Sequence, residues 1–350
     1  MSPPFLKLGP TSPMYFGALV TALPETSGSI SSRLARLSGW PIERPPMLKS
    51  RAIAASILAS ATLSRHRSSQ TRLEAMPMGA QEVLSCVTDP DLQIIPFVAV
   101  VQRDPAVVGE IIRVANSILY RGHDQVSSPK DAVIRLGLEE ACRIAAVVAS
   151  RALFRARSES LYALRPAVWD ELTHHSLCTA YGSAWLCRQL RAAEPGLAFL
   201  AGLFHNIGSV VALHVLLPLV HAGGVPIEAD DEICHLVCDR IHHELGPEQL
   251  LYFNMAPEIV SVCIHAADLD LPAEPAFRLH HVIRAVAGLL ALQRQSFENL
   301  ELSRVLAQSL AALALSKETT GLLYREMASL ADKVRIILNL PAKPTVVGGR

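Results

Sequence analysis

The chain has 350 residues, enough for two domains or for one large domain with an extension. Half of the residues are hydrophobic but only 5% are aromatic, which favours packed helices over an aromatic-rich β-sandwich. Lys and Arg number 32, as do Asp and Glu, and this balance argues against a domain built to bind nucleic acid, which usually has a clear basic excess.

Residues 1–70 differ in composition from the rest of the chain. Residues 1–46 are rich in Pro, Ser, Gly and Thr without a sustained period, which is typical of a poorly ordered extension. The Ala- and Ile-rich stretch Leu48–Leu63 predicts a single helix, and the polar stretch Arg65–Arg72 predicts a linker. No signal peptide is indicated at the N-terminus. We therefore expect the structured module to begin near residue 70.

Helix signals become regular from about residue 76. Asp104-Pro105 and Ser128-Pro129 each pair a capping residue with a Pro at the first helical position. Between them, Asn116 is expected to fix the turn by side-chain hydrogen bonds to the backbone, as Ser128 does at its helix.

Glycines and apolar periodicity extend this helical pattern to the rest of the chain. Gly122 and Gly137 lie where helix C-caps are expected. Further helices are predicted over residues 138–157, 166–193, 197–205, 207–217, 230–241, 243–253, 257–267, 276–293, 301–315 and 320–338. No stretch alternates with a period of two, so the sequence predicts an all-α fold.

One stretch, Phe199–Val220, is apolar enough to resemble a membrane span. Polar residues and a Pro interrupt it, namely His205, Asn206, His214 and Pro218, whereas a spanning helix needs about 20 apolar residues with few breaks. We interpret it as a buried pair of helices, so no membrane insertion is expected. The seven Cys form no Cys-x-x-Cys pair, which is typical of reduced core residues in a cytoplasmic protein.

Thirteen His occur in the chain, eleven of them after residue 170. Their contexts are His174-His175-Ser176, then Phe204-His205-Asn206-Ile207-Gly208, then His242-His243-Glu244-Leu245-Gly246, and finally Pro257-Glu258-Ile259-Val260 followed by His265. This order resembles the HD superfamily, whose pattern is a His, a His-Asp pair followed by Ile-Gly, further His and a late Asp. The resemblance implies that active relatives bind divalent metal, which activates water for phosphate-ester hydrolysis.

The first half of the chain narrows the resemblance to the HDOD branch of that superfamily. The matching segments are Asp89-Pro90-Asp91, Arg103-Asp104-Pro105-Ala106, Arg113-Val114-Ala115-Asn116-Ser117 and Ser127–Gly137. The resemblance covers roughly Leu73 to Leu292. It implies an HD-like helical bundle with a smaller helical N-terminal lobe: 71–292 as the HDOD domain (71–157 the lobe, 158–292 the HD-like half) and 293–350 as C-terminal helices and tail.

The chain departs from the active pattern at its carboxylates. Asn206 takes the place of the metal-binding Asp, and an amide is a far weaker ligand for a hard divalent ion. The late Asp aligns with Gly288, which offers no side chain; if that register is wrong, Asp268 or Asp270 could take the role. The six positions of the former HD site are therefore His175, His205, Asn206, His242, His265 and Gly288. We expect no catalytic residues, no bound metal and no cofactor.

Each of these residues also has a purely structural interpretation. His175 and His205 on apolar helix faces are typical of hydrogen-bonded core residues, and His242 with the adjacent His243 would cap a helix or face solvent. His174, His280 and His281 are expected at the surface or partly buried. Cys234 and Cys238, four residues apart beside His235, could form half of a soft-metal site, but no second pair has zinc spacing, so they are interpreted as helix core.

The function implied by the resemblance is bacterial signal transduction, often alongside cyclic-dinucleotide pathways, through contact with a protein partner. The low content of charged residues, 18%, also fits an exposed apolar face for a partner. Two alternatives stay open: a phosphohydrolase acting on nucleotides or cyclic dinucleotides with an unusual metal set, and a sensor that binds a nucleotide in the former active-site cleft without turnover. Phosphodiester hydrolysis with added Mn²⁺, Ni²⁺ or Fe²⁺, and nucleotide binding without turnover, would discriminate them. The sequence does not determine the oligomeric state.

Overall fold

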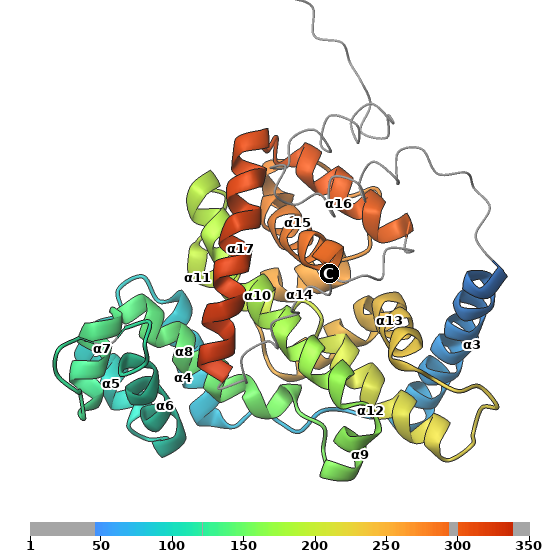
Figure 1. Ribbon diagram of the computed structural model, residues 1–350, viewed down its shortest axis with the longest axis horizontal. Helices are drawn as coiled ribbons and strands as arrows, with labels where there is room; N and C mark the ends of the chain where they lie inside the picture. Colours follow the sequence, from blue (N-terminus) through green and yellow to red (C-terminus); the bar gives the residue numbers. More distant parts are fainter. Residues whose placement is uncertain (1–45, 121, 294–299, 339–350) are drawn as a thin grey trace, which may run out of the picture. The chain divides into compact units, whose positions relative to one another are not determined.

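A computed structural model describes residues 46–120, 122–293 and 300–338, and every regular element in these ranges is a helix (Figure 1). The described residues divide into two compact units. We call the first the bundle, which comprises the described parts of 46–75 and 154–326, and the second the lobe, which comprises those of 76–153 and 327–338. The predicted all-α class is confirmed, since these ranges contain no strand.

The bundle is built from a long N-terminal helix and a run of core helices. Its members are α3 (Pro46–Ser69), α9 (Glu159–Leu164), α10 (Pro166–Leu190), α11 (Pro195–Phe204), α12 (Ile207–His221), α13 (Asp231–Tyr252), α14 (Pro257–Ile264), η3 (Pro275–Phe277), α15 (Arg278–Gln293) and α16 (Leu300–Ala312). Pro195–His221 is apolar and long enough for a membrane span by composition, but 83% of its most apolar window is buried in the protein. The predicted buried helix pair is thus confirmed in α11 and α12.

The N-terminal helix corrects our expectation for residues 1–70. Helix α3 extends through most of the predicted linker, and it packs on α12 and α13 with Leu58, Ala59 and Thr62 buried. Arg72 Nη2 reaches Glu248 Oε1 at 2.8 Å. The described part of this segment belongs to the bundle because its apolar face is covered there; residues 1–45 lie outside the described residues.

A second correction concerns α13, which the sequence predicted as two helices separated at His242. It is one helix that continues through Pro247. A Pro inside a helix removes one backbone hydrogen bond and usually ends or kinks the helix. Here the packing of α13 against α3, α12 and α14 outweighs that local cost. His242 and His243 consequently lie in the middle of a helix instead of preceding one.

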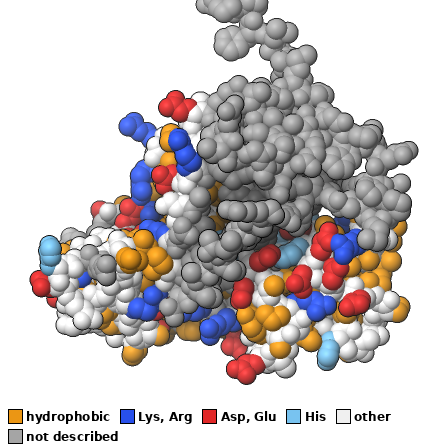
Figure 2. Space-filling model, in the orientation of Figure 1, with side chains coloured by type: hydrophobic (Ala, Val, Ile, Leu, Met, Phe, Trp, Pro, Cys, Tyr) orange, Lys and Arg blue, Asp and Glu red, His pale blue; other side chains and the backbone are white. Residues whose placement is uncertain are grey.

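Charges on the visible surface follow the overall balance of the sequence. On the face drawn in Figure 2, Lys and Arg side chains lie interspersed with Asp and Glu. Some of them pair across helices, as Arg51 Nη2 does with Asp230 Oδ2 at 3.0 Å. No continuous basic surface is visible among the described residues of this face.

The lobe is a small helical unit with an apolar interior. It contains α4 (Met78–Thr88), α5 (Ile94–Val101), α6 (Pro105–Ala115), α7 (Pro129–Leu136), α8 (Leu138–Ser150) and most of η2 (Arg151–Phe154). The division between the units falls inside α17 (Lys317–Leu338), whose second half belongs to the lobe. Phe97, Val107 and Ile111 are fully buried in its core.

The predicted capping residues of the lobe act as expected. Ser128 Oγ accepts from the Asp131 backbone N–H at 3.1 Å, which caps α7. Asn116 Nδ2 donates to the Val126 carbonyl at 2.8 Å while its Oδ1 accepts from the Val126 N–H at 3.0 Å. Both structural roles are thereby confirmed.

The two glycine predictions for the lobe have different outcomes. Gly137 ends α7 with a φ of 82°, as a C-cap glycine should. Gly122 is not a helix C-cap, because α6 already ends at Ala115 with Asn116 as its cap.

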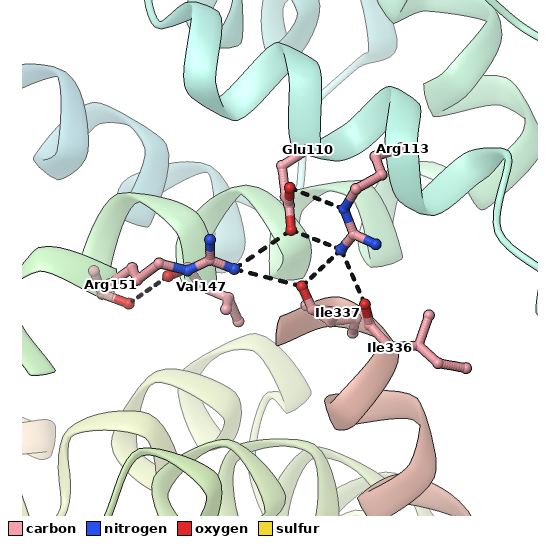
Figure 3. A network of polar contacts seen from close by, with 7 residues as sticks. Glu110, Arg113, Val147, Arg151, Ile336 and Ile337 are labelled. Atoms are coloured by element: carbon pink, nitrogen blue, oxygen red, sulfur yellow. Dashed lines mark hydrogen bonds and ion pairs between the residues drawn. The ribbon is translucent and has the colours of Figure 1, made fainter. Parts of the chain in front are cut away.

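Two arginines cap the C-terminal end of α17 (Figure 3). Arg113 Nη2 donates to the carbonyls of Ile336 at 2.9 Å and Ile337 at 2.8 Å. Glu110 accepts from Arg113 at 2.7 Å and from Arg151 at 3.4 Å, so one carboxylate holds both guanidiniums in place. Cationic donors on the last carbonyls of a helix satisfy groups that have no helical partner and favour the negative end of the helix dipole.

Candidate functional site

A cavity of about 110 Å³ lies inside the bundle. Helices α10, α12, α13, α15 and α16 contribute to its walls, which are mostly apolar. Five of the six positions predicted from the sequence line it: His175, His205, Asn206, His242 and Gly288. Residues more than 110 positions apart in the sequence therefore meet at one site, the one to which the resemblance to the HD superfamily assigned them.

Two histidines in this cavity are oriented by the backbone. In the neutral ring, His205 Nδ1 donates to the Gly202 carbonyl at 2.8 Å and His242 Nδ1 donates to the Cys238 carbonyl at 3.2 Å. Burial lowers the pKa of His242, partly offset by the nearby Asp239 carboxylate. A backbone carbonyl that orients one ring nitrogen leaves the other as an acceptor, which is the arrangement of metal-binding histidines. The His175 ring lies 5.2 Å from the His205 ring, centroid to centroid.

Asn206 is held in the wall by a neutral hydrogen bond. Its Oδ1 lies 2.7 Å from Ser176 Oγ, and Ser176 Oγ lies 2.9 Å from the Leu172 carbonyl. Asn206 is only 5% exposed and Ser176 is fully buried. The amide therefore fits its surroundings as an uncharged, hydrogen-bonded group.

The Ile-Gly that follows Asn206 has a steric role. A Cβ added to Gly208 would lie 2.0 Å from the His242 carbonyl oxygen and 2.7 Å from the Gly246 nitrogen. Real Cβ atoms do not approach that closely, so α12 and α13 can cross here only because residue 208 is a glycine. This crossing brings Asn206 and His242 to the same cavity.

Gly288 lines the cavity, but the space beside it is already filled. A Cβ at this position would lie 3.1 Å from both Cβ and Cδ1 of Leu306 on α16. A side chain long enough to bind metal there would require Leu306 to move. The C-terminal helix α16, whose role in the site the sequence analysis did not predict, thus backs the position of the missing carboxylate.

The remaining predicted position, His265, lies away from the cavity lining. Its Nδ1 pairs with Asp268 Oδ2 at 3.1 Å, and its ring packs on those of Phe277 and His280. Asp268 and Asp270, which we considered as substitutes for Gly288, do not line the cavity either. Of the three candidates for the late Asp position, Gly288 is the one that lines the cavity.

The remaining histidines and cysteines that the sequence analysis considered have mostly structural roles. His280 and His281 were expected at the surface or partly buried, and this is wrong, because they are 6% and 1% exposed. His281 Nε2 donates to the Pro272 carbonyl at 2.9 Å, and His280 Nε2 shares a hydrogen bond with Ser261 Oγ at 2.8 Å. Cys234 is buried, and burial raises the pKa of its thiol to about 11, as expected for helix core.

The residues of the cavity do not fit the metal shell of an active HD enzyme. Active sites of that class need carboxylates that offset the metal charge, whereas this cavity has an amide and a glycine at those two positions and one carboxylate elsewhere in its described lining, that of Asp239. Among the described residues, no group of three or more His, Cys, Asp or Glu side chains is placed to hold a metal ion.

Four polar residues of the cavity lining were not among the predicted site positions, namely Ser209, His235, Asp239 and Arg284. His235 and Asp239 share a face of α13 with His242, a helical spacing that could have been recognised. The signal for Arg284 was a charged residue in the apolar run Ile283–Leu290. Arg284 is 4% exposed, and its Nη2 donates at 2.7 Å to both the Asp268 carbonyl and Gln308 Oε1.

Comparisons with solved structures show the same fold in bacterial proteins. A protein from Shewanella amazonensis SB2B, provisionally named a metal-dependent phosphohydrolase, is 24% identical with a TM-score of 0.52, covering 77% of this chain and 99% of that one. An HDOD domain protein with unknown function from Geobacter sulfurreducens is 19% identical with a TM-score of 0.54, covering 83% and 97%. A protein from Marinobacter aquaeolei VT8, provisionally named a signal transduction protein, is 19% identical with a TM-score of 0.55, covering 82% and 65%.

A family model makes the assignment more specific than these structures do. No curated protein matches the chain. The HDOD domain model matches residues 73–267, which is more than half of the chain and ends before α15. Gly288 and Arg284 therefore lie outside the matched residues. On this match, the chain belongs to the HDOD domain family.

Proposed function

We propose that this chain is a non-catalytic regulatory module of bacterial signalling that acts through protein–protein contacts in the cytoplasm. The proposal rests on the residues found at the two positions where an active HD enzyme has carboxylates. Asn206 is engaged by Ser176, and Leu306 fills the space beside Gly288. A hard divalent ion bound there would lack the two carboxylates that these positions supply in active relatives, and Asp239 is the one carboxylate among the described residues that line the cavity.

Exposed apolar side chains on the lobe support a role in protein contact. Ile95 is 73% exposed, Ile118 is 72% exposed and Ile134 is 57% exposed. Exposed apolar residues mark an interaction surface where they adjoin one another, and we take these three as the candidate contact residues of the lobe. The link to cyclic-dinucleotide pathways rests on the family resemblance alone.

Turnover assays on the full chain test the non-catalytic part of the proposal. We expect no hydrolysis of bis(p-nitrophenyl) phosphate or of a cyclic dinucleotide above the blank, with Mn²⁺, Ni²⁺ or Fe²⁺ added. Elemental analysis after dialysis should find less than one equivalent of Fe, Mn or Zn. Turnover that disappears in His205→Ala would overturn the proposal, because it would show chemistry at this site.

Affinity capture from the native cell tests whether the lobe contacts a protein partner. The variant Ile95→Glu with Ile134→Glu should lose a partner that the unchanged chain retains. Ile53→Glu is the matched control, because Ile53 is 60% exposed but lies on α3 of the bundle. A partner lost equally from both variants, or retained by both, would exclude the lobe as the contact surface.

A further inference from the structure

The turn between α16 and α17 contains a strained residue. Residues 313–316 join the two helices, and Ala314 has a φ of 48°. The Leu315 N–H donates to the Leu310 carbonyl at 3.3 Å, which is the closing bond of a Schellman turn. Such a turn normally has Gly at its left-handed position, as Gly137 is at the end of α7, because a side chain there is unfavourable. The turn between α16 and α17 therefore stores backbone strain.

The residues of this turn are good helix formers. Their sequence is Leu-Ala-Leu-Ser, and Ala and Leu are among the residues with the highest helix propensity. Neither Gly nor Pro occurs from Leu300 to Thr320, so no residue there prevents a helix from continuing. The strain at Ala314 is relieved if α16 and α17 straighten into one helix, in which each N–H of the turn bonds to the carbonyl four residues earlier.

Helix α17 has one buried face along its length. Its members are spaced by three, four or seven residues, and each is at most 2% exposed: Thr320, Leu323, Met327, Val334 and Ile337. The residues up to 326 belong to the bundle and those from 327 belong to the lobe. A helix with such an apolar stripe is not stable alone in water. If α17 leaves its own bundle and lobe, it therefore needs an equivalent surface to cover this face.

The lobe holds the end of α17 with four charged side chains. Arg113 and Arg151 donate to its last carbonyls, and Glu110 accepts from both guanidiniums (Figure 3). One turn earlier, Lys333 Nζ lies 2.9 Å from Glu140 Oε1. At least 186 positions in the sequence separate each of these lobe donors from its acceptor on α17. The docking site thus recognises a helix end and a lysine, and a second α17 offers both.

We propose that two copies of the chain exchange α17, each helix docking on the bundle and lobe of the other copy. Straightening the turn carries Thr320 and Leu323 away from the place where they are buried in their own bundle. The exchanged helix makes in the second copy the contacts that it made in the first, so none is lost. Relief of the strain at Ala314, once in each copy, opposes the entropy cost of association. This inference concerns assembly and does not depend on the proposed regulatory role.

Sedimentation equilibrium of the full chain measures whether monomer and dimer coexist, and we expect a dimer that dissociates on dilution. Ala314→Gly relieves the strain in the monomer and disfavours the straight helix, so the dissociation constant should rise about tenfold or more. Arg191→Gly is the matched control, because Arg191 has the same φ of 48° but ends α10; relief of strain there acts equally on monomer and dimer, so its dissociation constant should stay that of the parent. A chain that is monomeric at every concentration, or a dimer that Ala314→Gly leaves unchanged, overturns the inference.

Zero-length cross-linking identifies which copy supplies α17. Chains labelled with ¹⁵N and unlabelled chains are unfolded, mixed and refolded, and a carbodiimide then joins the Lys333 amine to the Glu140 carboxylate. In an exchanged dimer, mass spectrometry should find linked peptides that combine a labelled with an unlabelled half. Lys333→Arg keeps the ion pair but lacks the reactive amine, so it should lose these peptides. Linked peptides of uniform label alone would show that α17 docks within its own chain, and the exchange would be excluded.

Discussion

At the scale of single residues, glycines and histidines decide how the site is assembled. Gly208 allows α12 and α13 to touch, and that contact sets the positions of Asn206 and His242, whereas the missing side chain of Gly246 leaves room for Cys263 on α14. The buried histidines differ from the cavity arginine, because they can lose their charge while Arg284 cannot at neutral pH. The close contact at Gly208 and the neutral state of the buried histidines both affect the free energy of unfolding, which can be measured.

Replacing Gly208 with Ala should destabilise the bundle by about 3 kcal/mol, at the upper end of the usual cost of overpacking a core. The added methyl group would meet the His242 carbonyl oxygen at 2.0 Å, so the two helices must separate. Chemical denaturation measures the change. Gly109→Ala is the control, because nothing lies within 4 Å of its Cβ position, and it should stabilise α6 by about 0.5–1 kcal/mol. Equal effects from both variants would contradict the close crossing.

Stability should fall as the pH drops from about 6.5 to about 4. Burial lowers the pKa of His214 and of His280 to about 4, from an ordinary value of 6.5. Because the unfolded chain binds these protons first, the stability contributed by the neutral rings is complete above pH 6.5 and is lost through this window. The loss amounts to roughly 3 kcal/mol per residue at most.

Denaturation across pH 4–7 checks the sign and the window. The double variant His214→Gln with His280→Gln should show a flatter profile than the unchanged chain. A double variant whose stability falls as steeply as that of the parent would mean that other groups control the acid transition.

At the scale of elements, capping governs where the helices of the lobe begin and end. Ser128 begins α7, Gly137 ends it, and Arg113 with Arg151 closes the end of α17. The first two were readable from the sequence because a cap and its helix are neighbours in the chain. The arginine caps were not, because Arg113 and Ile337 are joined only by the fold.

Replacing Ser128 with Ala should cost about 1 kcal/mol, the usual loss of a helix cap. The Ser128 hydroxyl accepts from the Asp131 N–H at 3.1 Å and so caps the first turn of α7. Thermal unfolding measures the change. Ser127→Ala removes a neighbouring exposed hydroxyl and should leave the melting temperature unchanged; a melting temperature unaffected by either variant would show that the cap is dispensable.

At the scale of the whole molecule, the bundle includes a helix that precedes the HDOD match. Leu58 on α3 is fully buried, and α3 packs on α12 and α13, two helices that carry cavity residues. We therefore expect residues 46–69 to resist limited proteolysis, with no cleavage boundary near residue 70. Leu58→Ser should expose α3 to cleavage, whereas Ile57→Ser should not, since Ile57 is 48% exposed. Rapid cleavage within residues 46–69 of the unchanged chain would show that α3 is not part of the protected core.

The sequence by itself determined the properties that depend on local order. Helical periodicity gave the all-α class, cap residues gave the ends of α7, and the ordered motifs gave the family. It also located five residues of the cavity, because the HD pattern fixes their sequence context. The neutral Asn206 was visible in the sequence for the same reason.

Only the tertiary structure decided the properties that depend on distant segments. It joined α13 into one helix across Pro247, since packing against three other helices outweighs a local helix breaker. It placed His265 outside the cavity lining, where the imidazole pairs with Asp268. It placed Leu306 against Gly288 and buried Arg284 in the cavity wall. These positions follow from how α15 and α16 pack, and no local pattern in the sequence encodes which side chains of two separate helices will meet.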